Sequence, residues 1–131
     1  MADKLFLELV SPEKLLVSSD VDNVFAMGTG GAFGLYPDHS PFCTELVPCV
    51  LTYAIGQETF KVIVSKGFLE VADNKVNVLA ERAVYVKDID AAKIKAEYDA
   101  LSAELAGEIA DDEIRREKET ALKFCETALN I

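Results

Sequence analysis

Residues 49–64 read CVLTYAIGQETFKVIV, two runs of β-branched, aromatic and other apolar residues separated by Gly56-Gln57. Side chains alternate across a strand, so the odd-numbered residues from 49 to 55 fall on one face. The two residues between the runs match the length of a tight β-hairpin turn. The second run is apolar on both faces, with Val62 and Val64 opposite Ile63. We interpret this as a strand of two packed sheets or of a flattened barrel.

The same pattern extends outward from this hairpin. From Lys4 to about Val86, short apolar runs alternate with turn-forming residues, as in an all-β sandwich or barrel. Asp73-Asn74 offers a second two-residue turn, between a strand at residues 68–72 and another at 75–80. The first two thirds of the chain are therefore predicted to be β-structure.

The spacing of apolar residues changes to three and four after Asp88, which predicts a helix. Asp88 or Asp90 can cap its start and Gly107 can end it. A second helix is predicted to open at Asp111 or Asp112, and the short link 107–110 requires the two helices to be antiparallel. The predicted apolar stripes are Ala91, Ile94, Tyr98, Leu101 and Leu105 in the first helix, and Ile114, Ala121, Cys125 and Ala128, flanked by Leu122 and Leu129, in the second.

These patterns predict a mainly β fold with an α-helical addition: a β-sandwich or flattened barrel over residues 1–87, followed by an antiparallel two-helix hairpin over residues 88–131. Charge follows the same boundary, because residues 1–87 carry 7 basic and 11 acidic side chains, and residues 88–131 carry 6 and 12.

Composition excludes several classes of protein. The 13 basic and 23 acidic residues give a net charge of -10, which disfavours nucleic acid as a partner. No run approaches the roughly 18 apolar residues of a membrane-spanning helix, and the N-terminus lacks the apolar core of a signal peptide. We expect a chain that stays in the compartment where it is made. The three cysteines form no C-x-x-C pair, so we expect free thiols and no disulfide framework.

Residues 28–42 contain most of the candidate chemistry. Asp38-His39-Ser40 has the residue types of a hydrolytic triad, but three successive residues of a turn point in divergent directions. Gly28-Thr29-Gly30-Gly31 lacks the Lys-Ser/Thr of a phosphate loop. His39 with Cys43 and Cys49 fits no common zinc spacing. We expect no catalysis, cofactor or metal here, and a turn shaped by Gly and Pro, with Leu35 and Phe42 as its anchors to the core.

The predicted helical hairpin is rich in alanine at its inner positions. Each Ala in place of Leu gives up about 2 kcal/mol of burial, at roughly 0.8 kcal/mol per methylene. Two interpretations stay open: a weak seam that a partner can open, or a close helix packing that only small side chains permit.

Four motifs together resemble the epsilon subunit of F-type ATP synthases, across essentially the whole chain. The most specific is the turn G-x-x-G-x-x-P-x-H-x-P, followed by a GFLEV strand and a two-helix tail. The resemblance implies a β-sandwich of about ten strands and a helical hairpin. The motifs are SPEK at residues 11–14, GAFGLYPDHSP at 31–41, GFLEV at 67–71 and VNVLA at 76–80.

The resemblance implies a noncatalytic rotor subunit at the foot of the central stalk. Its sandwich contacts the gamma subunit and the ring of c subunits, at the cytoplasmic face of the inner membrane and without inserting into it. Ala32 stands where many relatives have a glutamate, so a charged contact to the ring there is absent or is made by Asp38. The interface residues it indicates are Ser11, Ala32, Phe33, Asp38 and His39.

In this family the hairpin can extend into the catalytic hexamer of alpha and beta subunits and obstruct ATP hydrolysis. The cations available for such contacts are Arg115, Arg116, Lys118 and Lys123. Some relatives bind ATP through an I-D-x-x-R-A motif, which suggests an alternative function, an ATP-sensing regulatory module. Here Ile89, Asp90 and Lys93 occupy the motif positions, and lysine replaces the motif arginine.

Overall fold

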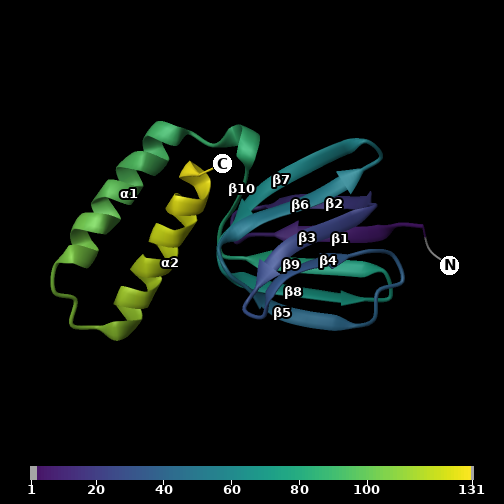
Figure 1. Ribbon diagram of the computed structural model, residues 1–131, viewed down its shortest axis with the longest axis horizontal. Coiled ribbons are helices and arrows are strands. Elements are labelled where there is room, and N and C mark those ends of the chain that lie inside the picture. Colours follow the sequence, from purple (N-terminus) through teal and green to yellow (C-terminus); the bar gives the residue numbers. More distant parts are fainter. Residues whose placement is uncertain (1–2, 131) are drawn as a thin grey trace.

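The computed structural model describes residues 3–130 of the 131-residue chain. Within them, ten strands form one strongly curved sheet and two helices follow it, side by side at one end of the sheet (Figure 1). The predicted fold class is confirmed. The strands are β1 (Leu5–Val10), β2 (Leu15–Val21), β3 (Asn23–Gly28), β4 (Gly31–Leu35), β5 (Phe42–Leu46), β6 (Cys49–Ile55), β7 (Glu58–Val64), β8 (Gly67–Ala72), β9 (Lys75–Ala80) and β10 (Ala83–Tyr85); a 3₁₀ turn (Val86–Asp88) leads to α1 (Ala91–Ala106) and α2 (Asp112–Leu129).

The sheet folds over on itself into a flattened, nearly closed barrel. Its strand order is β10-β7-β6-β3-β5-β8-β9-β1-β2, with β4 paired to β3. The β1–β9 pair is parallel, and the other strand pairs are antiparallel. The two ends of this path approach each other where the Tyr85 hydroxyl lies 3.4 Å from the Leu16 carbonyl and 2.7 Å from the Tyr53 hydroxyl. Few strand edges are therefore left open to water.

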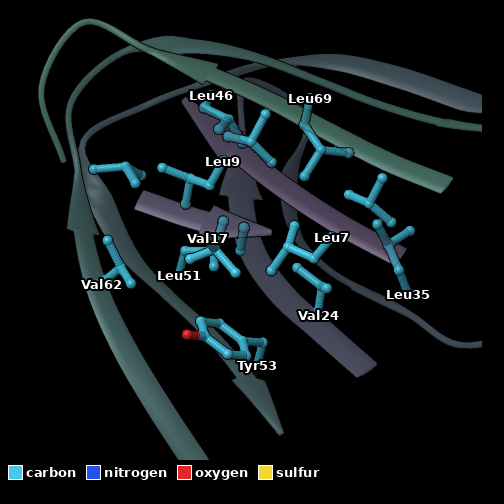
Figure 2. Packing of buried hydrophobic residues seen from close by; sticks show 14 of the residues in the cluster. Leu7, Leu9, Val17, Val24, Leu35, Leu46, Leu51, Tyr53, Val62 and Leu69 are labelled. Carbon is cyan, nitrogen blue, oxygen red and sulfur yellow. The ribbon is translucent and has the colours of Figure 1, made fainter. Parts of the chain in front are cut away.

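Strand alternation fills the interior of the barrel with aliphatic side chains. Leu7, Leu9 and Leu51 are fully buried, and they meet Val24 and Leu69 from other strands (Figure 2). The alternation predicted for residues 49–55 is confirmed except at Ile55, which is 38% exposed. This core includes no helical residue.

Both predicted hairpin turns are present. Gly56 connects β6 to β7 with a φ of 62°, and Asp73 and Asn74 connect β8 to β9 with φ values of 51° and 61°. In the Asp73-Asn74 turn φ is positive at both central residues, which is the geometry of a type I′ turn and which Asn and Asp tolerate better than most residues. The turn chemistry thus fixes the register of both hairpins.

Strand β7 is apolar on both faces for a reason that differs from our interpretation. Val62 and Val64 point into the barrel, as expected of a packed sheet. Ile63 points outward and is also fully buried, because the two helices cover it. The outer face of the sheet at β7 is therefore the platform on which the hairpin rests.

The predicted helix ends are confirmed. The Asp90 carboxylate accepts hydrogen bonds from the amides of Ala92 (3.1 Å) and Lys93 (3.3 Å), and α1 ends at Gly107. Asp111 caps α2 in the same way, through the amides of Glu113 (2.8 Å) and Ile114 (3.3 Å). Each cap satisfies amides that the first helical turn leaves free. Within residues 3–130, neither helix is long and apolar enough to cross a membrane.

The predicted apolar stripes are only partly correct. Ala91 is exposed and Ile114 is 45% exposed, so neither belongs to the buried seam. The buried residues are Ile94 in α1 and Phe124, Cys125 and Ala128 in α2. The hairpin meets the sheet through the start of α1 and the end of α2, so Ile114, at the far end of the hairpin, stays in water. Phe124, which the predicted stripe omits, is its largest buried side chain.

Gly67 provides a test of the β8–β9 packing. A Cβ atom at Gly67 would lie 2.0 Å from the Leu79 carbonyl oxygen, whereas one at Gly30 would meet no atom within 4 Å. We expect Gly67→Ala to lower the free energy of unfolding by about 2 kcal/mol or more, and Gly30→Ala to change it by less than about 0.5 kcal/mol. Urea denaturation measures both. Equal effects of the two substitutions would contradict the close approach of these strands.

Candidate functional site

The structure places two of the predicted interface residues, Ser11 and Asp38, at opposite ends of the sheet. Ser11 follows β1, at the end where Val10 pairs with Leu79 of β9. Asp38 lies at the other end, where it contacts Asn74 in the β8–β9 turn. Ser11 is 8% exposed, and its amide donates to the Lys14 carbonyl at 2.9 Å. Ser11 and Asp38 therefore cannot belong to one small binding pocket.

The turn between β4 and β5 is fixed to the neighbouring hairpin. The Asp38 amide donates to Asn74 Oδ1 at 2.5 Å, and Asn74 Nδ2 donates to Asp38 Oδ1 at 3.2 Å. Asp38 has a φ of 65°, which is uncommon for a non-glycine residue although Asp tolerates it, and these reciprocal bonds hold it in place. The turn is thus a rigid projection.

His39 is a packing residue of this turn. Its Nδ1 lies 2.7 Å from the Ser40 carbonyl oxygen, so its contact with Ser40 is to the backbone. Its ring packs at 6.1 Å from that of Phe42, which packs at 5.3 Å from Phe33 of β4. Leu35 is fully buried as predicted, but Phe42 is 36% exposed, so this second anchor was wrong: Phe42 packs on Phe33 and His39 at the surface.

Ala32 lies on the outer surface of β4, opposite Met27 of β3. Phe25 and Met27 are 39% and 44% exposed there, and with Ala32 and Val50 they line a shallow hollow of about 590 Å³. This surface is apolar at the position where many relatives have a glutamate, and Asp38 lies in the turn beyond the far end of β4.

An apolar groove lies beside Ser11. Its volume is about 630 Å³, and Val10, Pro12, Leu46, Phe68 and Leu79 line it. Phe68 and Leu79 are paired across β8 and β9, and they are 57% and 61% exposed. Glu45, Lys66 and Glu81 form a charged rim. Two large apolar side chains held side by side in water, with a polar border, are typical of a protein interaction surface.

Sequence analysis did not single out Phe68 and Leu79, although a signal was present. In GFLEV the inward residues are Leu69 and Val71, which leaves Phe68 outward, and in VNVLA the inward residues are Val76 and Val78, which leaves Leu79 outward. An outward Phe on one strand opposite an outward Leu on the next forms an apolar pair that points away from the core, which indicates a binding surface.

The three residues at the ATP-binding motif positions have different surroundings. The Asp90 carboxylate is engaged in capping α1, Ile89 is partly buried against the seam, and Lys93 is exposed. Among residues 3–130, no group of His, Cys, Asp and Glu side chains could hold a metal ion.

The four cations of α2 differ in what they contact. Lys118 pairs with Glu104 of α1, and Lys123 lies 3.7 Å from Glu126. Arg115 donates to the Gly107 carbonyl at 3.4 Å. Arg116 makes no ion pair within the part of the chain that the structure describes. In the docked hairpin, three of the four cations are therefore already in contact with acidic side chains or a backbone carbonyl of the hairpin itself.

Two groups at the hairpin seam have shifted pKa values. The Arg82 guanidinium donates to Glu97 at 2.7 and 3.1 Å and lowers the pKa of that carboxyl. Burial, with the neighbouring Glu97 charge, raises the pKa of the Cys125 thiol to about 11. Cys125 is therefore a neutral, fully buried thiol.

Comparison with known proteins identifies the family. The family model "ATP synthase, Delta/Epsilon chain, beta-sandwich domain" matches residues 4–86. The chain belongs to the ATP synthase epsilon chain family. The epsilon chain of Geobacter metallireducens is 39% identical over 94% of this chain and 89% of its own, and that of Nitratidesulfovibrio vulgaris (strain DP4) is 44% identical over 81% and 79%. The resemblance inferred from the four motifs is confirmed, and the protein is a noncatalytic subunit of the ATP synthase.

Solved structures share the fold at low identity. A chain of the Euglena gracilis mitochondrial ATP synthase, from a structure of its OSCP, F1 and c-ring, superposes with a TM-score of 0.79 at 22% identity, covering 97% of this chain and 80% of that one. A chain from the central stalk and c-ring of the Tetrahymena thermophila mitochondrial ATP synthase gives 0.63 at 12%, covering 96% of both chains. The shared fold therefore extends over the helices as well as the sandwich.

Proposed function

We propose that this epsilon chain is a rotor subunit of the central stalk, in which residues 1–87 bind partner subunits and residues 88–131 regulate ATP hydrolysis. The apolar groove at Phe68 and Leu79 carries the proposal, because it presents exposed apolar area on a rigid, self-contained barrel. A subunit that transmits torque needs contacts that do not deform, and residues held in a sheet provide more rigid contacts than residues in mobile loops. The Tetrahymena structure, of a central stalk and c-ring, supports this place in the complex.

The groove beside Ser11 is assigned to the gamma subunit. Its floor is apolar and its rim carries both signs of charge, which suits a helical partner with an apolar face and polar flanks. Permanent subunit contacts bury apolar surface of this kind, and Phe68 and Leu79 would supply its centre.

The other interface residues are assigned to the c-ring. Phe33, Asp38 and His39 belong to one packed unit, held by the Asp38–Asn74 bonds and by the contacts of Phe42 with Phe33 and His39. Ala32 precedes Phe33 in β4 and lies on the opposite face of that strand, beside Met27, so it would extend the contact to the outer face of the sheet. A stiff projection with few charges fits a partner whose exposed loops are polar and closely spaced.

The helical hairpin is assigned a regulatory role. Its seam with the sheet has five buried residues, with partly buried apolar residues around them, against twenty buried residues in the barrel core. A modest difference in binding free energy can therefore shift the hairpin between docked and extended states. In the extended state Arg115, Arg116, Lys118 and Lys123 would face the alpha and beta subunits. Their neighbours Glu113, Glu117, Glu119 and Glu126 dilute this charge, so steric obstruction contributes more than ion pairing.

The gamma assignment predicts a strong effect at the groove. Phe68→Asp places a charge at its centre, and we expect at least about 30-fold weaker binding to the cognate gamma subunit, as for an interface hot spot. Ile114→Asp is the matched control, because Ile114 is also an exposed apolar side chain but lies on the hairpin. Calorimetry on the two variants, both with unchanged thermal unfolding, measures the difference. Equal affinities would contradict the assignment.

The regulatory assignment predicts that removal of residues 88–131 raises ATP hydrolysis in the reconstituted enzyme while ATP synthesis continues. The full-length double variant Arg115→Glu, Arg116→Glu separates the two modes of obstruction: we expect it to hydrolyse ATP nearly as slowly as the wild type. Unchanged hydrolysis after truncation would refute the inhibitory role, and gamma binding by the sandwich would stand independently.

A further inference from the structure

The seam between the hairpin and the sheet has a small apolar centre. Ile63 of β7 meets Ile94 of α1 and Phe124, Cys125 and Ala128 of α2. The barrel core comprises a separate and larger cluster of buried residues, to which no helical side chain contributes. Burial of apolar surface therefore favours docking of the helices only weakly compared with folding of the barrel.

One polar side chain crosses this seam to both helices. Arg82, between β9 and β10, donates from Nη1 to Glu97 Oε2 at 2.7 Å and from Nη2 to Oε1 at 3.1 Å, a bidentate contact with α1. The same guanidinium lies 4.3 Å from the centre of the Phe124 ring of α2. Such a planar, forked contact on one side and a cation–π contact on the other require arginine and a defined geometry.

Arg82 itself belongs to the rigid side of the seam. Its carbonyl accepts from the Ser65 amide at 2.8 Å, and the preceding Glu81 amide donates to the Lys66 carbonyl at 3.1 Å. These bonds continue the pairing of β7 and β8 with their neighbours, so the Arg82 backbone is fixed on the sheet. The helices can therefore leave only by giving up both contacts of its side chain.

We propose that Arg82 is the latch of the helical hairpin, and that its simultaneous contacts with Glu97 and Phe124 set how often the helices detach from the sheet. Among residues 3–130, the Arg82–Glu97 pair is the only ion pair between the sheet and the helices. A bidentate contact weakens steeply when its partners shift, so the latch gives the seam a defined closed position that apolar contacts alone do not provide. This inference holds whichever subunit the released helices meet.

The three thiols of the chain provide an internal measurement of release. Cys43 is exposed, Cys49 is buried in the barrel core, and Cys125 is buried in the seam. With a thiol reagent under native conditions, Cys43 should react at once, Cys125 only when the hairpin opens, and Cys49 only when the barrel unfolds. The labelling rate of each cysteine in the full-length chain, resolved by peptide mass spectrometry, therefore reports each event separately.

The latch predicts that Arg82→Ala speeds labelling of Cys125 about tenfold and leaves the Cys49 rate unchanged. Arg82→Lys keeps the charge but loses the fork and the stacking, so we expect a rise of about threefold. Glu97→Gln breaks the same contact from the α1 side, but it also removes the charge that raises the pKa of Cys125, so the Arg82 variants decide between the outcomes. A more acidic thiol cannot explain the increase for Arg82→Ala, because the Arg82 charge acts to lower the pKa of Cys125 and its removal acts the other way.

Glu81→Gln is the matched control, because it removes the adjacent Lys66–Glu81 pair, which lies wholly on the sheet. Its Cys125 rate should stay within about twofold of the wild type. The proposal is overturned if Arg82→Ala labels Cys125 no faster than Glu81→Gln does. It is also overturned if Cys49 and Cys125 accelerate together, because Arg82 would then stabilise the barrel and not the docked hairpin.

Discussion

The contact between the outer face of β7 and the two helices is the constraint on which the architecture depends. Inside the barrel, Val62 and Val64 of this strand join a core that is complete without the helices. Outside it, Ile63 is buried only because the helices cover it. The dependence is therefore one-sided: the helices need the sheet to bury their apolar residues, whereas the barrel buries its own. A fold with this asymmetry can release one part and keep the other intact.

This one-sided dependence allows the barrel and the helices to have separate functions. The rigid barrel carries the surfaces proposed for partner subunits, with the groove at Phe68 and Leu79 near one end of the strands and the turn at Asp38 and His39 at the other. The helical pair carries the proposed regulation and meets the barrel on a third surface, which Arg82 joins to both helices. Partner contacts and helix release can thus change independently.

Local features of the fold followed directly from the sequence. Gly56, Asp73 and Asn74 mark turns whose backbone angles few other residues accept, and Asp90 and Asp111 mark helix starts because their carboxylates bond free amides. Each of these depends on residues close together in the chain. The family could also be inferred from the sequence, because the resemblance rests on short motifs.

Features that depend on distant contacts were harder to predict. Ile63 suggested two packed sheets or a flattened barrel, because the pattern shows apolar residues on both faces of the strand but does not show that helices cover the outer face. Ile114 and Ala91 fit a helical stripe, yet the helices meet the sheet over part of their length. Arg82 had no signal, since its partners are fifteen and more residues away. Strand alternation and the Asp73-Asn74 turn place Phe68 and Leu79 outward, but the groove that they form with Val10 and Leu46 depends on the pairing of distant strands.

Native-state hydrogen exchange of the full-length chain tests the central claim, that the helices detach as a unit from a barrel that stays folded. We predict that amides in the middle of α1 and α2 exchange together, at least about 100-fold faster relative to their intrinsic rates than those of β1, β7 and β9. Equal protection of the helices and these strands would show a single cooperative unit and would contradict the account.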